Sequence, residues 1–283
     1  METLSAYARN TYSQRGEDGI IARILDLIGP IPKWCAEFGA WDGIHLSNTH
    51  ALMEQGWSGV FIEGSPERFK ELKKTYSGNP KAYPICAFVG FQPLTDLDSL
   101  LATTPIPKDF GILSIDIDGN DYHVWEASCL YRSSLVVIEY NPTIAPHISF
   151  VQPKNPQINQ GNSLRALVEL GKRKGYELIA TTSLNAFFVR EDLFPLVGVS
   201  DNSVETLFAD RSSLMDAFQL YDGTLVFTGK RKLFWHGIDL DGFQPIPKFF
   251  RIFPANMGNV RAVLFKIWRR LVNWRSRGNE VPR

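Results

Sequence analysis

The sequence predicts an α/β fold built on a mostly parallel sheet, with helices on both of its faces. Over the first 150 residues, short apolar segments of strand length alternate with segments of helical periodicity, as in strand–helix–strand units. Some apolar segments, such as LVVI at 135–138, are continuous, which is expected of strands buried on both sides. Ligands of such folds bind beyond the carboxyl ends of the strands, so the residues there are the first candidates for function.

Seven segments have the composition of strands, and they lie at 33–38, 57–63, 81–89, 109–117, 133–141, 176–183 and 185–192. Helical patterns lie between them, at 47–56, 65–76, 94–103, 121–127 and 163–175. The helix at 65–76 begins with Ser65 and Pro66 and ends in lysines, which suits the helix dipole. Pro84 predicts an edge position for the third strand, because proline cannot donate to a neighbouring strand. The last two strands predict an antiparallel hairpin that completes a seven-stranded sheet.

Three parts of the chain are distinguished. Residues 1–192 form the predicted core, residues 193–256 extend it with one further strand at 225–229, and residues 257–283 form a basic helix. Nine lysine and arginine residues and one acid give residues 246–283 a formal charge of +8, so the rest of this neutral chain carries −8. Such a tail predicts an anionic partner surface or docking on its own domain. A nucleic-acid partner is not predicted, because the body is acidic and no recognition motif is present.

The basic tail also has an amphipathic pattern, since apolar residues recur at spacings of three and four from Val260 to Trp274. Tryptophan and arginine on one amphipathic helix are typical of helices that lie in a membrane interface. The alternative is a terminal helix packed on its own domain or on a second subunit. Both interpretations stay open at this point.

Cysteine usage and the amino terminus predict a cytoplasmic protein. Cys35, Cys86 and Cys129 are widely spaced and form no CxxC pair, so neither a zinc site nor a disulfide framework is indicated. Reduced thiols are the simple interpretation. The first residues lack the apolar segment of a signal peptide, and no run of 18 apolar residues could span a membrane.

The first predicted strand ends in EFGAWDG at 37–43, where Gly39 and Gly43 flank a tight strand-to-helix turn. Glycine there lets a ligand approach the backbone, and the following helix presents its positive end. Trp41 occupies the place of the second glycine of a dinucleotide-binding G-x-G-x-x-G motif, which argues against an NAD-dependent enzyme. Glu63 ends the second strand 20 residues after Gly43, where related folds hold a ribose. The structural alternative for Glu63 is a cap for the next helix. Together the two features predict an adenosine-containing ligand.

Four motifs stand in order along the chain, and they are YSQRGEDGI at 12–20, EFGAWDGIHLSNT at 37–49, GWSGVFIEGSP at 56–66 and ILSIDIDGNDYHVW at 112–125. This ordered set resembles the FkbM-like family of S-adenosylmethionine-dependent methyltransferases, from about residue 12 to about residue 190. The resemblance implies a Rossmann-like class I methyltransferase fold with a C-terminal extension. It also implies that residues 1–192 bind S-adenosylmethionine.

The resemblance also implies where the cofactor lies. Ser13 and Gln14 are expected near its methionine end, Glu63 at the ribose, and 86–88 near the adenine. The full set of expected cofactor residues is Ser13, Gln14, Glu37, Gly39, Ala40, Gly43, Asn48, Glu63, Cys86, Ala87, Phe88 and Asp116.

The segment SIDIDGNDYHVW at 114–125 is rich in acids directly after the fourth strand. A calcium loop of the EF-hand type beginning at Asp116 would need glycine sixth and glutamate twelfth, but these positions hold Asp121 and Ala127. Neighbouring parallel strands lie about 4.8 Å apart. Acids ending the fourth strand could therefore meet Glu139 and Asn141, which end the fifth. These oxygen ligands suit Mg²⁺ or Mn²⁺, and the predicted metal ligands are Asp116, Asp118, Glu139 and Asn141.

Two other interpretations of the acidic segment stay open. Asp121 could cap the next helix, and the strand-end acids could bind substrate hydroxyls directly. Histidines are further candidates for a base, and they are His45, His50, His123 and His147. We expect Asp116, Asp118 and His147 to be catalytic, with the loop 141–161 covering the acceptor.

The sequence thus predicts an S-adenosylmethionine-dependent O-methyltransferase. The expected acceptor is small, a sugar hydroxyl of a glycan or glycoside, and a divalent metal could assist the transfer. The alternative is a catalytically inactive nucleotide-binding scaffold or partner subunit with the same fold. The intact Glu37, Gly39, Gly43 and Glu63 argue against that alternative. Membrane contact through 257–283 and a homo-oligomer are the partner interactions that the sequence leaves open.

Overall fold

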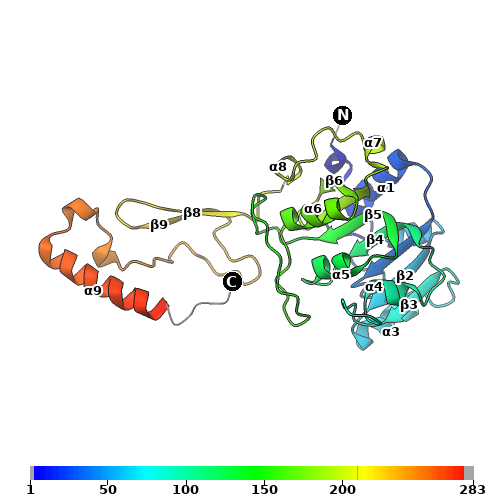
Figure 1. Ribbon diagram of the computed structural model, residues 1–283, viewed down its shortest axis with the longest axis horizontal. Helices are drawn as coiled ribbons and strands as arrows, with labels where there is room; N and C mark the ends of the chain where they lie inside the picture. Colours follow the sequence, from blue (N-terminus) through cyan, green and yellow to red (C-terminus); the bar gives the residue numbers. More distant parts are fainter. Residues whose placement is uncertain (1–2, 209, 277–283) are drawn as a thin grey trace. The chain divides into compact units, whose positions relative to one another are not determined.

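The computed structural model describes residues 3–208 and 210–276, and the chain divides into two compact units (Figure 1). The first unit runs to Arg211, and the second begins at Ser212. Two short helices that follow the predicted core, α7 (Phe194–Val197) and α8 (Val204–Leu207), lie within the first unit. The first unit contains the whole seven-stranded sheet, so it contains every strand end that the sequence analysis singled out.

The sheet has the strand order β3-β2-β1-β4-β5-β7-β6. Its strands are β1 (Trp34–Phe38), β2 (Ser58–Glu63), β3 (Ala82–Cys86), β4 (Asp109–Ile115), β5 (Arg132–Glu139), β6 (Tyr176–Thr181) and β7 (Asn185–Arg190). The pairs among β1 to β5 are parallel, and β7 runs antiparallel to both β5 and β6. The predicted fold class, a Rossmann-like class I methyltransferase fold, is confirmed. Pro84 lies on β3 at the edge of the sheet, as predicted.

Helices cover both faces of this sheet (Figure 1). The neighbours Phe187 and Phe188 of β7 show this, because successive strand residues point to opposite faces. Phe187 belongs to the buried cluster that contains α1 (Glu17–Ile28), whereas the ring of Phe188 lies 5.1 Å from that of Trp125 in α5 (Asp121–Ala127). A Cβ added at Gly171 of α6 (Leu164–Arg173) would meet the same Phe188 ring at 3.0 Å. Both faces are therefore closely packed.

The helix α1 is the main element that the sequence analysis did not predict. It buries Ile20, Ile21, Ile24 and Ile28 against the sheet, at spacings of one, three and four residues. The remaining helices of this unit are η1 (Leu4–Tyr7), α2 (His50–Glu54), α3 (Pro66–Thr75) and α4 (Leu97–Leu101). The predicted helix at 47–56 is shorter in the structure because residues 47–49 form a loop that bonds to Glu37.

The second unit consists of a hairpin and a long terminal helix. Strand β8 (Met215–Gln219) pairs antiparallel with β9 (Leu225–Gly229), so the predicted strand at 225–229 is confirmed. Two short turns, η2 (Lys248–Phe250) and η3 (Pro254–Asn256), lead to α9 (Asn259–Ser276). The predicted helix at 257–283 is present over this range, and its residues 277–283 lie outside the described part of the chain. Among the helices that the structure describes, we find none long and apolar enough to cross a membrane.

Candidate active site

The turn after β1 lies directly against the end of β4, and Gly39 makes this contact possible. A Cβ at Gly39 would stand 1.7 Å from the backbone oxygen of Asp116, closer than any side chain allows. Gly39 also has a φ of 74°, in the left-handed region that favours glycine. Gly43 has a φ of 80°, and a Cβ there would meet the Tyr76 ring at 2.6 Å. Sterics therefore require glycine at both ends of this turn.

Glu37 is buried at the end of β1, and its carboxylate folds the following loop back onto the strand. The hydroxyls of Ser47 and Thr49 donate to Glu37 Oε2 at 2.6 and 2.7 Å, and the Asn48 amide donates to Oε1 at 2.8 Å. Asn48 Nδ2 in turn donates to Ser114 Oγ on β4 at 3.1 Å. Burial raises the pKa of Glu37, while these donors oppose that effect. Glu37 and Asn48 therefore hold this loop against β1 and β4.

Glu63, at the end of β2, holds two backbone segments together. Its Oε2 accepts from the Trp41 amide at 2.9 Å, and its Oε1 accepts from the Ser65 amide at 2.7 Å. The buried Ala40 is tied to the same strand, because its amide donates to the Ile62 oxygen at 3.2 Å. Glu63 therefore fixes the glycine turn relative to α3, and its side chain is 5% exposed. Ser65, rather than Glu63, accepts the capping bond of α3.

The residues after β3 lie beside the same turn. The Ala87 amide donates to the backbone oxygen of Glu63 at 3.1 Å, and Cys86 is exposed. Phe88 is 79% exposed, and its ring lies over Gly64, where a Cβ would meet it at 2.5 Å. An exposed aromatic ring beside a strand end is a surface on which a flat ligand can stack.

The amino-terminal loop is folded around two acids of α1. Asp18 Oδ2 accepts from the amides of residues 11–13 and from the Ser13 hydroxyl, which lies 2.7 Å away. Ser13 is therefore buried and bonded within its own loop, whereas Gln14 is exposed. Glu17 is buried, and its Oε1 accepts from Thr182 Oγ1 at 2.8 Å and from Asn185 Nδ2 at 3.1 Å.

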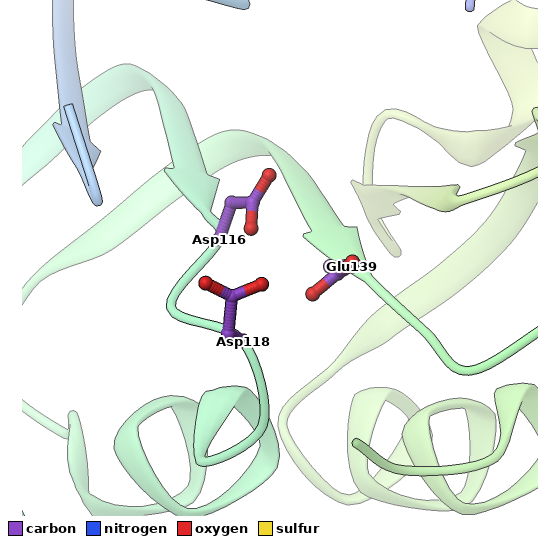
Figure 2. Close-up of side chains that lie close together, drawn as sticks. All are labelled: Asp116, Asp118 and Glu139. Atoms are coloured by element: carbon purple, nitrogen blue, oxygen red, sulfur yellow. The ribbon is translucent and has the colours of Figure 1, made fainter. Parts of the chain in front are cut away.

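Three carboxylates face one another where β4 and β5 end (Figure 2). One oxygen from each of Asp116, Asp118 and Glu139 lies within 4.8 Å of the others, and together they could hold a metal ion. Asp118 has a φ of 58°, an uncommon backbone conformation for a residue other than glycine. Asp121 stabilises this turn, because its carboxylate accepts from the amides of Ile117 and Gly119, both at 2.9 Å. It therefore bonds to the turn before α5 instead of capping the helix.

The surrounding protein and like charges make two of these carboxyl groups, Asp116 and Glu139, hard to ionise. The pKa of Asp116 is raised to about 7, first because protein surrounds it and then because Asp121 and Asp118 carry like charge. The pKa of Glu139 is raised to about 10, by burial first and then by the negative Asp116. Asp116 also reaches solvent, so water screens part of its repulsion. At neutral pH the cluster therefore shares at least one proton, which a bound cation would displace.

Asn141 and His123, two of the other candidates, are engaged elsewhere. Asn141 Oδ1, the atom expected to bind a metal, accepts from the amide and hydroxyl of Thr143 at 3.0 and 2.7 Å. His123 is buried, and its Nε2 lies 2.8 Å from the backbone oxygen of Gln152. His147 is exposed on the loop after β5. The roles assigned to Asn141 and His147 stay predictions.

The loop after β5 is attached to the acidic turn through side chains that the sequence analysis did not single out. Asn162 Nδ2 donates to the Gly119 oxygen at 2.8 Å, and Asn120 Nδ2 donates to the Ile158 oxygen at 3.2 Å. Gln152 Oε1 accepts from the amides of Gln160 and Gly161 at 2.9 and 3.0 Å. The asparagines and glutamines of this loop were noted only as composition, and their fixed role depends on contacts across the fold.

Asn185 is a second residue without a signal of its own in the sequence. In the antiparallel pairing of β5 and β7 it lies opposite Glu139, so both side chains point to the same face of the sheet. Its amide oxygen is buried and has no hydrogen-bond partner among the described residues. A buried acceptor of this kind normally has a donor. The position beside Glu139 is therefore prepared for a donor group of a ligand.

Comparison with known proteins gives similarity of fold only. No family model matches the chain, and no curated protein matches it. A SAM-dependent methyltransferase from Aquifex aeolicus aligns over 59% of this chain and 87% of its own, with 9% identity and a TM-score of 0.37. The N-terminal domain of EvdMO1 with SAH bound aligns over 62% and 80%, with 13% identity and a TM-score of 0.42. The CurJ carbon methyltransferase aligns over 64% and 56%, with 6% identity and a TM-score of 0.41. These values are too low to say anything about activity, so the functional argument comes from this chain's own residues.

Proposed function

We propose that the protein is an S-adenosylmethionine-dependent methyltransferase that methylates a hydroxyl group, assisted by a divalent cation. The observation that carries this proposal is the position of the three-carboxylate cluster directly beside the glycine turn of β1. The backbone oxygen of Asp116 lies where a Gly39 side chain would be, so the turn and the cluster are neighbours. A cofactor on the turn and an acceptor at the cluster would therefore meet.

The residues around the turn fit an adenosine-containing cofactor. The turn between Gly39 and Gly43 follows β1 at the carboxyl edge of the sheet, and Glu63 lies behind the turn with further lone pairs on each carboxylate oxygen. Phe88 offers an exposed ring next to the end of β3. The turn supports the cofactor site that the family resemblance implies at 37–43. Glu63 supports the implied ribose contact, and Phe88 supports the implied adenine contact.

The carboxylate cluster fits a small hard cation. Three carboxylate oxygens within 4.8 Å form a donor set typical of Mg²⁺ or Mn²⁺ and unlike that of zinc. Asp116 and Asp118 are exposed, so solvent and an acceptor have access to them. The unpaired Asn185 oxygen beside Glu139 offers a contact for a ligand N–H or O–H donor. A bound cation would supply charge that lowers the pKa of an acceptor hydroxyl.

The reaction is a displacement in which the carbon–sulfur bond of the sulfonium breaks as a carbon–oxygen bond to the acceptor forms. The electron pair of the broken bond stays on sulfur, and the hydroxyl proton must leave. Asp116 is our candidate base, because its carboxylate belongs to the cluster at which the acceptor hydroxyl would be held. His147 is the second candidate base.

The proposed acceptor is a sugar hydroxyl of a glycan or glycoside. Its support is the FkbM-like resemblance and the polar loop 141–161, which carries exposed residues at 147–150. Vicinal hydroxyls are suitable ligands for a cation held by acids, and sugars supply them. Residues 147–150 are where we expect acceptor selection to occur.

Calorimetric titration with S-adenosylhomocysteine tests this function. We expect micromolar binding by the intact protein, and weakening by more than about tenfold in Glu63→Ala, because a buried ribose contact is lost. Asp118→Ala is the matched control, since it should keep cofactor binding while losing Mg²⁺ or Mn²⁺ binding. Absence of binding in a folded sample would overturn the methyltransferase proposal and favour a scaffold. Full cofactor affinity in Glu63→Ala would remove that residue from the site.

A further inference from the structure

The second unit differs from ordinary globular domains in burying no hydrophobic side chain among the residues that the structure describes. Many of its aromatic side chains are instead exposed to solvent. Those more than 45% exposed are Phe218, Tyr221, Trp235, Phe243, Phe249 and Phe253. Soluble proteins rarely leave this much aromatic surface uncovered. The unit is therefore built to meet another surface.

The helix α9 has two different apolar faces. Phe265 and Trp268 pack internally, with ring centroids 5.5 Å from that of Phe250 in η2. The other face is uncovered within the unit. It carries a stripe at spacings of four, three and four residues that is between 45% and 77% exposed, formed by Val260, Leu264, Ile267 and Leu271. Aromatic packing therefore fixes the helix while its second face stays available.

Basic side chains flank the exposed stripe. Lys266, Arg269 and Arg270 are exposed. At 100° per residue Lys266 and Arg270 lie to one side of the stripe, and Arg269 lies on the opposite face. Residues 246–276 contain no aspartate or glutamate, so no acid of this segment neutralises them. Residues 212–283 as a whole hold twelve lysine and arginine residues against five acids, a formal charge of +7. An apolar stripe with basic side chains beside it matches the boundary between lipid tails and anionic headgroups.

We propose that the second unit is a membrane-docking module that binds an anionic lipid surface through α9. The stripe would enter the headgroup region while the flanking basic side chains meet lipid phosphates. Charge favours this occupant over pairing with the α9 helix of a second copy. Two α9 helices packed face to face would bring arginines together without a carboxylate to pair them, whereas an anionic bilayer supplies phosphate along the whole helix. This inference is independent of the proposed activity.

Co-sedimentation of the full chain with lipid vesicles tests the proposal. We expect binding to mixed phosphatidylcholine and phosphatidylglycerol, and a loss of about tenfold or more on phosphatidylcholine alone or in high salt. The double variant Leu264→Asp with Leu271→Asp should abolish binding by placing charge on the stripe. The triple variant Lys266→Glu, Arg269→Glu, Arg270→Glu should do the same through charge. The matched control is Leu130→Asp, at a 63% exposed leucine of the first unit, which should bind like the wild type.

Other outcomes would overturn the proposal. Circular dichroism and retained S-adenosylhomocysteine or metal binding would show that the variants fold. If the intact chain does not sediment with anionic vesicles, the docking function is wrong. If it is a dimer in ultracentrifugation and the Leu264→Asp, Leu271→Asp variant is a monomer, a second copy covers the stripe. If all variants bind vesicles equally well, the lipid contact lies elsewhere.

Discussion

The carboxylates at the strand ends fall into two groups with opposite surroundings. Glu37 and Glu63, on β1 and β2, are buried with every oxygen bonded to a loop amide or hydroxyl. Asp116, Asp118 and Glu139, on the β4 and β5 side, face one another instead. Each oxygen of the first group accepts a bond that shapes the protein, and Glu63 keeps further lone pairs for a ligand. The second group leaves negative charge uncompensated, which costs stability unless a cation or a proton is present.

This difference separates two roles within one edge of the sheet. The β1–β2 side forms a fixed cradle, since its acids hold the loop 40–49 in one conformation. The β4–β5 side is the reactive site that we propose, because its acids are available to a ligand. Substituting a residue with a structural role should lower the free energy of unfolding, whereas substituting a residue that only contacts the ligand should not. Stability measurements can therefore distinguish the two kinds of residue.

The largest expected effect is the loss of stability in Glu37→Ala. Three buried donors would lose their acceptor, and each unsatisfied group costs roughly 1–3 kcal/mol, so we expect a loss of about 3–5 kcal/mol in the free energy of unfolding. Asp118→Ala is the control from the other group and should change that free energy by less than about 1 kcal/mol. Urea unfolding measures both. Equal losses of stability in the two variants would contradict the structural role of Glu37 that Asp118 lacks.

The second prediction concerns the pH dependence of the metal-free protein. A carboxyl group whose pKa is raised by folding stabilises the fold when protonated, so that stability is present below about pH 4 and is lost as pH rises. For Asp116 and Glu139 the loss extends through pH values of about 7 and about 10. Because solvent screens the cluster, we expect the free energy of unfolding to fall by about 1–2 kcal/mol between pH 5 and 8. Unfolding in the presence of EDTA measures this change.

Glu139→Gln is the variant that tests this slope, because it keeps the shape of the side chain and removes its charge. It should flatten the pH dependence, and Mn²⁺ should raise the melting temperature of the wild type but not of this variant. Asp109→Asn, an exposed acid at the opposite end of β4, is the control and should keep the wild-type slope. A slope that survives in Glu139→Gln would show that the remaining carboxyl groups with raised pKa values, Asp116, Glu37 and Asp121, account for it.

The smallest effect is expected at Phe88, on the cradle side. Phe88→Ala should weaken S-adenosylhomocysteine binding about three- to tenfold, because an exposed stacking contact is worth about 0.5–1.5 kcal/mol. Stability should not change, since the ring is 79% exposed. Leu94, which is 84% exposed, provides the control Leu94→Ala with unchanged affinity. Equal affinities in both variants would place the adenine away from Phe88.

The strands were predictable because continuous apolar runs and turn residues are local signals. All seven predicted strands of the sheet are present, and the parallel register explains why Asp116 and Glu139 meet. The helix α1 was missed although Glu17, Asp18 and the apolar spacing from Ile20 to Ile28 are visible in the sequence. Its N-cap is Gly16, which provides no side-chain cap of the kind that marks the start of α3, α4 and α6.

Other features depend on contacts that no local pattern encodes. Glu37 bonds to residues ten to twelve positions later, which follows only from how the loop folds back. Asn141 was expected at the cluster because it ends the fifth strand. In the structure its amide oxygen instead forms a turn with Thr143, a common behaviour of asparagine before proline. Aspartate adopts the left-handed conformation of Asp118 more readily than most residues do, and the contacts of Asp121 with Ile117 and Gly119 hold the turn on either side of it.

The loop after β5 has a tethered half and an open half, and this division matters for engineering and for divergence. Asn162 is buried and ties the loop to the acidic turn, and Gln152 is buried and holds the loop together from within. Residues 147–150 are exposed. Changes at 147–150 can therefore accumulate without moving the carboxylates, while a change at Gln152 or Asn162 would disturb both at once. A library aimed at new acceptors should diversify the open half and leave the tethers untouched.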